Sequence, residues 1–497
     1  MGMGNQTESL LTCDELSGAV HGTVCALAEN LKNFTFTSVA TDSRNVVSGT
    51  LFVPLIGEFQ DGHKYIPQAI EKGATVCFVT KKIYDADSKK YMSLLSDNPQ
   101  IVFIVVDNNL KALQDAARAY VKKFPDLVKV SVTGSSGKTT TKEICKSILQ
   151  QKYNLIATVG NFNSETGLPL SVFNIRSEHE CGLFEMGMNR ENEIGEIARV
   201  FKPNYAIITN IGTAHIGILG SRENIAQEKK KVFSYVNENG AAIIPQNDDF
   251  RDYLAKGIPG KVVFFGKDVS EEESGVKFIE DLGVNGTRFA VDGVETVLKI
   301  PGSYNYQNAL GAIALAKVLG LTTEQIVKGI EELKAPEGRS SIREVSTVKD
   351  ASGNFKKITI LEDCYNANPD SMESAIEMCS KLSVSGNKYF ILGDMFELGA
   401  ASVEAHSKTG ALAAVSDAAA LYFVGRDMKN GAEAAKEAGK TCVKYFEDSE
   451  DANLNKLCDE LLSELKDGDF VFVKASHGMH LEKIIEKIVD KESDEAN

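Results

Sequence analysis

The sequence predicts an α/β protein of several domains, in which helices cover both faces of parallel sheets. With 497 residues the chain is too long for one hydrophobic core, so roughly two to four domains are expected. Short apolar runs bounded by turn residues alternate with helical patterns, as in βαβ units. A glycine-rich loop also separates one such run from a helix, within residues 131–144. The strand-like runs are "GATVCFVT", "IVFIVV", "VKVSV", "YAIIT", "KITILED", "KYFILGD", "ALYFV" and "DFVFVKAS".

Three blocks follow from places where this pattern changes. The first, residues 1–107, ends at Asp107, where "DNN" opens the helix-like stretch "LKALQDAARAYVKKF". The second, residues 108–336, holds the glycine-rich loop and ends in "LKAPEGR", where Pro336 and Gly338 break the helical pattern. The third, residues 337–497, closes with the acidic segment "KESDEAN", which we expect to fray.

Composition excludes several classes of protein. Lys and Arg total 54 against 69 Asp and Glu, and the net charge of −15 argues against general nucleic-acid or membrane-surface binding. There is no apolar run long enough to span a membrane, and no basic segment followed by an apolar core suggests a secretory signal. The nine cysteines lack a CxxC pair, which predicts reduced, mostly buried thiols in a cytoplasmic protein.

The loop "SVTGSSGKTTTKEI" has the features of a phosphate-binding loop. Gly134 and Gly137 let backbone N–H groups converge on phosphate oxygens at a helix N-terminus. Lys138 can reach the outer phosphates, and the Thr139 hydroxyl can ligate Mg²⁺. The alternative is a tight strand-to-helix turn that happens to carry a lysine. The predicted phosphate contacts are Gly134, Ser135, Ser136, Gly137, Lys138, Thr139 and Thr140.

Two further residues follow predicted strands. Glu185 ends the apolar run in "CGLFEMGMNR", where a carboxylate is costly unless it is paired or binds metal. His215 lies in "YAIITNIGTAHIGILGS", and Ser221 is the expected N-cap of the helix "SRENIAQEKKKVF". In a doubly wound sheet, ligands bind beyond the carboxyl ends of strands, so Thr139, Glu185 and His215 could converge. Simpler interpretations also exist. His215 could be a structural or solvated loop residue, and "EKKK" could be a solvated helix face.

The ordered motifs of the chain resemble those of a known family. "TDSRNVVSGTLFVPLIGEFQDGHKYIPQAIEKGA" is similar to its UDP-sugar-binding domain. "TGSSGKTTTKE", "GNFNSETGLPLS", "EMGMNRENEI", "TNIGTAHI", "LGSRENIAQEKK" and "PGSYNYQNALGA" then follow in the order of its central ATPase-like domain. "EDCYNANPDSM", "LGDMFELG" and "VKASHGMHLEKI" resemble its C-terminal Rossmann-like domain. The family is the Mur ligases, and "GNFNSETGLPL" with "LGDMFELG" points to the MurF type.

The resemblance implies an ATP-dependent carbon–nitrogen ligase of peptidoglycan precursor synthesis. ATP would phosphorylate the terminal carboxylate of UDP-N-acetylmuramoyl-tripeptide, and the amine of D-Ala-D-Ala would attack the acyl phosphate to give an amide, ADP and phosphate. The implied partners are these small molecules and Mg²⁺, two ions in all, without nucleic acid or stable membrane association. A cytoplasmic monomer is expected.

The resemblance also implies roles for individual residues. Lys138 would stabilise the transferring phosphoryl group, and Thr139 with Glu185 would hold one Mg²⁺. His215 and a carbamylated Lys229 would hold the second ion. The adjacent Lys230 and Lys231 leave open which of the three lysines is carbamylated. The nucleotide would also contact Asn161, Asn305, Asn308, Arg339 and Asp363. The substrate would contact Ser43, Arg44, Asp61, His63, Asn366 and Asn368.

Some residues depart from the family pattern, and alternatives remain open. Tyr304 stands where His is usual, and Ala475 and His477 replace Gly and Arg. Asn366 and Asn368 could simply form a turn before a proline. Competing functions are a sister ligase that adds one amino acid, a folylpolyglutamate synthase, a P-loop kinase or NTPase, and a non-catalytic UDP-sugar-binding protein. The third residue of the acceptor peptide, lysine or diaminopimelate, is not specified by the sequence.

Overall fold

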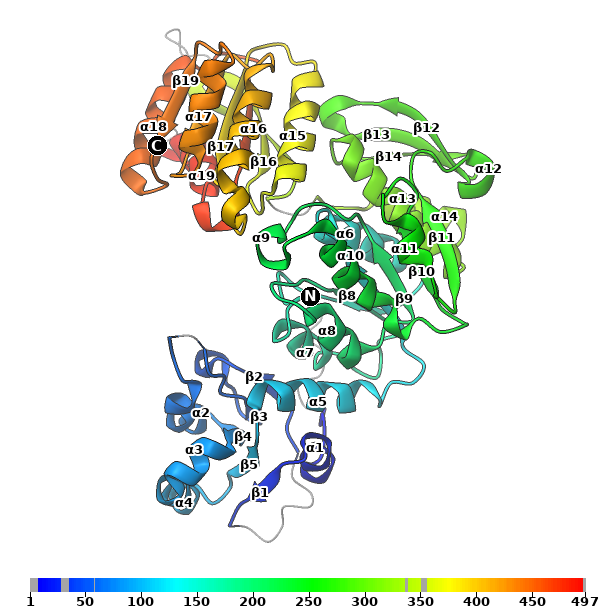
Figure 1. The fold of residues 1–497 in the computed structure, drawn as a ribbon, viewed down its shortest axis with the longest axis vertical. Coiled ribbons are helices and arrows are strands. Elements are labelled where there is room, and N and C mark those ends of the chain that lie inside the picture. The colour runs from blue at the N-terminus through cyan, green and yellow to red at the C-terminus, as the bar shows by residue number, and fades with distance from the viewer. Residues whose placement is uncertain (1–7, 28–34, 58, 336–337, 350–354, 495–497) are drawn as a thin grey trace. The chain divides into compact units, whose positions relative to one another are not determined.

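The fold is given by a computed structural model, which describes residues 8–27, 35–57, 59–335, 338–349 and 355–494 (Figure 1). The chain divides into two compact units. The first unit takes in residues 1–132, 153–206 and 231–240. The second takes in residues 133–152, 207–230 and 241–497.

The first unit contains two groups of strands with their helices. Its helices are α1 (Cys13–Val20), α2 (Ile66–Glu71), α3 (Lys81–Ala86), α4 (Ser88–Asp97), α5 (Asn109–Val121), α7 (Gly167–Val172) and α8 (Glu193–Phe201). Its strands are β1 (Thr23–Cys25), β2 (Ser38–Ala40), β3 (Thr50–Phe52), β4 (Ala74–Thr80), β5 (Val102–Val106), β6 (Val128–Thr133), β7 (Leu155–Ala157), β8 (Cys181–Glu185) and the start of β9 (Tyr205–Ile208).

The N-terminal sheet of this unit has the order β1-β5-β4-β3-β2. Strands β2 to β5 are parallel, and β1 runs antiparallel to β5. Every residue of β5 is buried, as its continuous apolar run predicts for a central strand. Helix α5 begins after Asn108, whose side chain accepts a hydrogen bond from the Lys111 N–H and so caps the helix.

The other strands of the first unit position Glu185. Strand β8 lies between β6 and β7 and is parallel to both. All five of its residues are buried, and Glu185 is the last of them. The apolar strand thus delivers a carboxylate to its carboxyl end, where ligands bind in parallel sheets.

The second unit carries the remaining elements. Its helices are α6 (Lys138–Leu149), α9 (Ile216–Leu219), α10 (Arg222–Lys230), α11 (Arg251–Ala255), α12 (Glu271–Ser274), α13 (Ser303–Val318), α14 (Thr323–Glu331), α15 (Pro369–Lys381), α16 (Ser402–Ala414), α17 (Met428–Glu437), α18 (Asp451–Glu464) and α19 (Glu482–Asp494). Its strands after the end of β9 are β10 (Ala241–Pro245), β11 (Lys261–Phe265), β12 (Val276–Asp281), β13 (Thr287–Val291), β14 (Val294–Leu298), β15 (Ser341–Lys349), β16 (Phe355–Asp363), β17 (Lys388–Gly393), β18 (Ala420–Val424), β19 (Val443–Phe446) and β20 (Phe470–Lys474).

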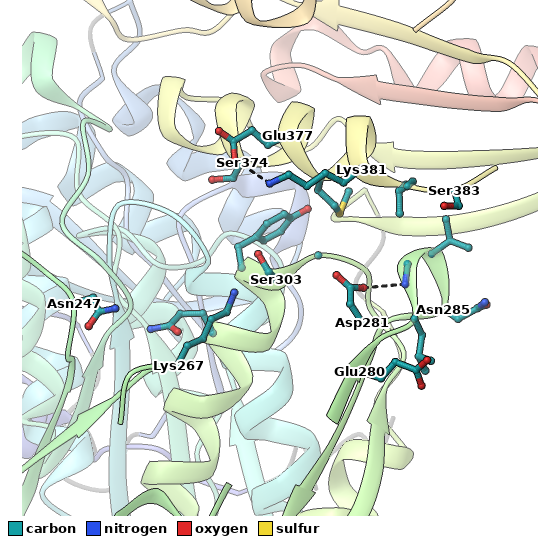
Figure 2. A pocket seen from close by; sticks show the side chains of 18 of the residues that line it. Asn247, Lys267, Glu280, Asp281, Asn285, Ser303, Ser374, Glu377, Lys381 and Ser383 are labelled. Atoms are coloured by element: carbon teal, nitrogen blue, oxygen red, sulfur yellow. Dashed lines mark hydrogen bonds and ion pairs between the residues drawn. The ribbon is translucent and has the colours of Figure 1, made fainter. Parts of the chain in front are cut away.

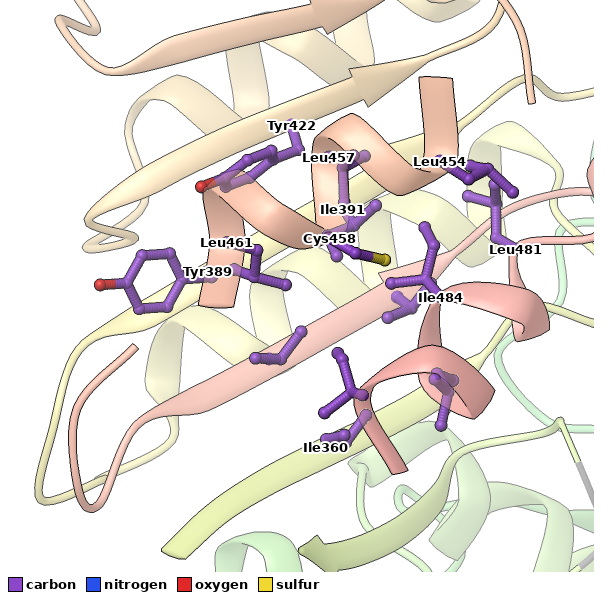
Figure 3. Close-up of a cluster of buried hydrophobic side chains, with 14 of the residues drawn as sticks. Ile360, Tyr389, Ile391, Tyr422, Leu454, Leu457, Cys458, Leu461, Leu481 and Ile484 are labelled. Carbon is purple, nitrogen blue, oxygen red and sulfur yellow. The ribbon is translucent and has the colours of Figure 1, made fainter. Parts of the chain in front are cut away.

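The C-terminal sheet of the second unit is a covered, mostly parallel sheet. Its order is β15-β16-β20-β17-β18-β19, with only β15 antiparallel. Helices α18 and α19 pack on one face through a cluster that includes Leu457, Leu461 and Ile484 (Figure 3). Helices α15, α16 and α17 supply residues to the cluster on the other face, including Met372 and Met428. Two buried faces explain why β17, β18 and β20 are continuous apolar runs.

The predicted α/β class with parallel sheets is confirmed, and each of the eight predicted strand runs contains a strand. The antiparallel sheet formed by β12, β13 and β14 was not predicted from the sequence. Asp292 and Gly293 have φ of 45° and 85° and make the two-residue turn between β13 and β14. This Asp-Gly pair was the overlooked sequence feature.

Other expectations have mixed outcomes. None of the nine cysteines forms a disulfide, and seven are buried, as predicted. In the described ranges no helix has the length and apolar character to cross a bilayer. The boundary predicted at 336–337 and the end of the acidic tail, 495–497, lie outside the described residues. The predicted boundaries of the three blocks stay predictions.

Candidate active site

The glycine-rich loop leads into α6 with an open helix N-terminus. Gly137 precedes the helix with φ of 74°, and no side chain caps it. A Cβ at this position would lie 2.6 Å from Oδ1 of Asn308, so a larger residue would collide there. The first N–H groups of α6 and the helix dipole could therefore hold an anion, and the predicted contact with phosphate stays a prediction.

Lys138 and Lys229 both turn to this loop. The Gly134 carbonyl accepts hydrogen bonds from Nζ of Lys138 at 2.9 Å and from Nζ of Lys229 at 2.8 Å. Lys229 is only 1% exposed. Burial lowers the pKa of Lys229 well below its ordinary value, and the charge of Lys138 lowers it further. The next lysine, Lys230, instead donates to the carbonyls of Tyr253 and Lys256.

The segment after β9 is tied to the phosphate loop. Thr209 Oγ1 donates to the Ser136 carbonyl at 2.6 Å. The side-chain amide of Asn210 donates to Ser136 Oγ at 2.9 Å, and Gly212 N donates to Ser135 Oγ at 2.9 Å. These bonds fix the segment that leads to His215 beside the loop.

His215 ends this segment in a left-handed conformation, with φ of 66°. Its Nδ1 lies 2.9 Å from Oε2 of Glu397. Burial lowers the pKa of His215, and Lys138 and Lys229 lower it further against the opposing effect of Glu397. The side chains of Lys138, Lys229 and His215 therefore lie close enough to interact electrostatically.

The N-terminal turns of α13 lie against the same loop. Asn308 approaches Gly137, and its amide donates to Oδ1 of Asn305 at 3.3 Å. Asn305 is buried and donates to the Pro301 carbonyl. Tyr304, the departure from the family pattern, shares a hydrogen bond of 2.9 Å with Ser340 Oγ. The tyrosine thus joins α13 to the segment that carries Arg339.

Asp363 ends β16 and is held by two donors. Its Oδ1 accepts from Ser340 N at 3.1 Å, and its other oxygen pairs with Lys474. The guanidinium of Arg339 lies 4.2 Å from the ring centre of Tyr365. The Tyr365 ring also stacks on His477, with centroids 4.9 Å apart. His477, the second departure, therefore belongs to an aromatic stack in this structure.

Comparison with known proteins identifies the family. Residues 132–316 match the model of the Mur ligase middle domain, residues 338–477 the Mur ligase glutamate ligase domain, and residues 35–121 the Mur ligase family catalytic domain. A UDP-N-acetylmuramoyl-tripeptide–D-alanyl-D-alanine ligase of Treponema pallidum is 40% identical over 486 residues, which cover 97% of this chain and 100% of the relative. The chain belongs to the Mur ligase family.

Solved structures agree with this assignment. A MurF structure from Acinetobacter baumannii has a TM-score of 0.80 and 27% identity, covering 97% of this chain and 99% of its own. A MurF ligase from Thermotoga maritima in complex with ADP has a TM-score of 0.76 and 26% identity, covering 92% and 98%. The predicted three-part architecture of the Mur ligase fold is thus confirmed.

The predicted metal ligands are distributed over both units. Glu185 of the first unit is 1% exposed, and its Oε1 accepts from the Asn163 amide at 2.7 Å. Thr139 is the second residue of α6, in the second unit. Within the described residues no group of three or more His, Cys, Asp or Glu could hold a metal ion. The Mur ligase prediction uses a threonine and a modified lysine, so it stays a prediction.

In the N-terminal part, His63 is fully engaged by protein groups. Its Nδ1 lies 2.6 Å from Asp61, and its Nε2 accepts from the Thr80 N–H at 3.0 Å. The Arg44 side chain is 83% exposed and pairs with Asp42. Arg44 can therefore meet a ligand at the surface, whereas buried His63 supports the loop that contains it.

Ser43 and the two asparagines of the C-terminal part also have protein partners. Ser43 Oγ donates to Gln68 Oε1 at 2.8 Å. Asn368 caps α15 by accepting from Ser371 N, so the turn interpretation applies to it. The Asn366 side chain accepts from Ala367 N. Asn161 is exposed in the first unit. Their predicted contacts with ligands remain predictions.

A crevice of about 830 Å³ opens in the second unit beside Tyr304 (Figure 2). Lys267, Asp281 and Lys381 contribute charges of both signs to its lining. Burial lowers the pKa of Lys267. Its lining contains no residue of the phosphate loop, 134–140, and none of the asparagines predicted to bind nucleotide, so the crevice is distinct from that loop.

Sequence reasoning missed several partners of the predicted residues. Glu397, Lys474 and Asn163 contact His215, Asp363 and Glu185, respectively. Each lies within a motif that the sequence analysis quoted. The pairings themselves had no local pattern, because they join residues far apart in the chain.

Proposed function

We infer that the chain is an ATP-dependent ligase that joins D-alanyl-D-alanine to UDP-N-acetylmuramoyl-tripeptide in peptidoglycan precursor synthesis. The likeness to a ligase of this type, 40% identical over 97% of this chain, carries the inference. The phosphate loop with Lys138, Lys229 and His215 beside it supports the ATP-dependent step. A P-loop kinase would leave the matches at 35–121 and 338–477 without a purpose.

The proposed reaction has two chemical steps. An oxygen of the acceptor carboxylate attacks the γ-phosphorus of ATP, the bond to the β-phosphate oxygen breaks, and ADP leaves. The amine nitrogen of D-Ala-D-Ala then attacks the carbonyl carbon of the acyl phosphate. Phosphate leaves with the original carboxylate oxygen, and the nitrogen loses a proton as the amide forms.

Within this chain the phosphate loop binds and orients the triphosphate. The open N-terminus of α6 supplies N–H donors and a favourable dipole. Lys138 on the same turn carries a positive charge toward the phosphoryl group, in an electrostatic role. Its present bonds to the Gly134 and Ser135 carbonyls show that its Nζ lies against the loop.

The residues beside the loop fit a bound Mg²⁺. A carbamate forms on a neutral amine, and burial with the charge of Lys138 favours the neutral form of Lys229. His215 would share that ion with the carbamylated Lys229. Thr139 and Glu185 are proposed ligands of a second ion. Bound Mg²⁺ would neutralise charge that develops on the phosphoryl oxygens.

The remaining contacts are proposed from the family motifs. For the nucleotide they are Asn161, Asn305, Asn308, Arg339 and Asp363, and for the substrate Ser43, Arg44, Asp61, His63, Asn366 and Asn368. We also propose a monomer in the cytoplasm. The lack of disulfides among the nine cysteines supports a reducing compartment.

The direct test is the mass of the product. The purified chain, ATP and Mg²⁺ are incubated with UDP-N-acetylmuramoyl-tripeptide and D-Ala-D-Ala, with Lys138→Ala as control. We expect a UDP-linked product heavier by one dipeptide less water, formed only by the unsubstituted chain. In a parallel incubation with UDP-N-acetylmuramoyl-dipeptide and single amino acids, a product heavier by one amino acid less water would assign the chain to a sister ligase.

A further inference from the structure

The segment that carries His215 is held from two sides. On one side, Thr209, Asn210 and Gly212 bond to the phosphate loop. On the other, it meets residues that follow β16 and β17 of the C-terminal sheet, all within the second unit. This second set of contacts joins the segment to the C-terminal sheet rather than to the phosphate loop.

Asp370 makes the first of these contacts. It lies in the first turn of α15, and its Oδ2 accepts from Thr213 N at 2.6 Å and from Thr213 Oγ1 at 2.9 Å. A Cβ on Gly212 would overlap this carboxylate, so the lack of a side chain there leaves room for Asp370. Because one carboxylate oxygen accepts both bonds, Asp370 fixes the backbone at Thr213, two residues before His215.

Glu397 makes the second contact. Its backbone has φ of 64°, an uncommon conformation for glutamate, and Oε2 lies 2.9 Å from Nδ1 of His215. Its carbonyl also lies close to α9, because a Cβ on Gly217 would be 2.9 Å from that oxygen. The close approach of these two backbones sets the Glu397 side chain against the imidazole.

We propose that Asp370 and Glu397 are positioning residues that orient His215 for metal binding. The inference rests on the proposed role of His215 as a ligand of Mg²⁺. With Nδ1 facing a carboxylate, the proton is held on Nδ1 and Nε2 is the nitrogen presented to a metal. A carboxylate behind a metal-binding histidine fixes its ring orientation and tautomer, and loss of such a partner typically costs about 10- to 100-fold in metal affinity. The C-terminal sheet thereby completes a site that the phosphate loop begins.

The test compares charge-matched variants of the full chain. Glu397→Ala and Asp370→Ala remove the two contacts, and Glu397→Gln restores an acceptor for Nδ1. Glu404→Gln and Glu373→Gln are controls, since Glu404 is exposed on α16 and Glu373 pairs with Lys408 on the surface. The readouts are Mn²⁺ affinity by electron paramagnetic resonance, in the presence of a non-hydrolysable ATP analogue, and hydrogen exchange of residues 211–219 without ligand.

We expect Mn²⁺ binding to weaken about 10-fold or more in Glu397→Ala, with partial recovery in Glu397→Gln and no change in the controls. Asp370→Ala should speed exchange of residues 211–219 at least about tenfold. Unchanged Mn²⁺ affinity in Glu397→Ala would overturn the inference, provided that His215→Ala binds more weakly. If His215→Ala also binds Mn²⁺ as the unsubstituted chain does, the proposed metal role of His215 fails instead.

Discussion

Replacing Lys229 by methionine should separate catalysis from stability. The Lys229 side chain is 1% exposed, and methionine keeps most of its volume while removing the amine. The Gly134 carbonyl loses one hydrogen bond but still accepts from Lys138. The free energy of unfolding should therefore fall by about 1 kcal/mol or less, since the cost of burying the amine is also removed.

Catalysis should fall far more than stability. Without its amine the residue cannot carry a carbamate, and removal of one electrostatic group from a transition state typically costs about 100- to 1,000-fold in kcat. The assay is phosphate release with saturating acceptor and D-Ala-D-Ala, beside urea unfolding of the same preparation. Small carboxylates should restore part of the rate in Lys229→Ala.

Lys230→Met is the matched control, because Lys230 donates to carbonyls of Tyr253 and Lys256 away from the loop. It should keep the unsubstituted rate. A full rate in Lys229→Met, or an equal loss in Lys230→Met, would refute the role given to Lys229.

Three further outcomes are expected. Gly217→Ala should lower kcat/KM for ATP roughly 5- to 100-fold, because its Cβ would press on the Glu397 carbonyl at a cost of about 1–3 kcal/mol. The control Gly18→Ala places its Cβ in open space and should have no effect. Equal rates in the two variants would show that the contact with Glu397 is dispensable. Tyr304→Phe should reduce the free energy of unfolding by about 1 kcal/mol through loss of the bond to Ser340, with KM for ATP within about threefold; a large change in KM would instead place the hydroxyl on the nucleotide. Burial lowers the pKa of His179, so its neutral form favours folding, and this stability is present above about pH 6.5 and lost as the pH falls toward the lowered pKa. Urea unfolding at pH 7.5 and 5.5 should show a smaller acid loss in His179→Gln, and identical losses would contradict that assignment.

Local sequence patterns predicted the elements that carry the site. The strand, two glycines and lysine of the phosphate loop appear as expected, and Ser221 accepts from Asn224 N as the predicted cap of α10. These features depend on neighbours within a few residues. The buried strand that ends at Glu185 was likewise predicted from its own residues, which form a continuous apolar run.

Long-range pairings could not be predicted in the same way. His215 was expected at a strand end, but its contact with Glu397 joins residues 182 positions apart. The contact of His63 with Thr80 likewise joins residues that no local pattern connects, and the predicted contact of His63 with substrate stays a prediction. Only the folded chain shows which polar atoms already have partners. The antiparallel sheet around Asp292 was missed for another reason, since its turn was not used as evidence.

The central claim is that the phosphate loop serves to activate a carboxylate. It can be tested with UDP-N-acetylmuramoyl-tripeptide that carries ¹⁸O in its terminal carboxylate, supplied with ATP, Mg²⁺ and D-Ala-D-Ala. If the carboxylate attacks ATP and is then displaced as phosphate, one labelled oxygen should appear in each inorganic phosphate released from labelled acceptor. Released phosphate without the label would mean that water attacks ATP, and the account of the active site would be wrong.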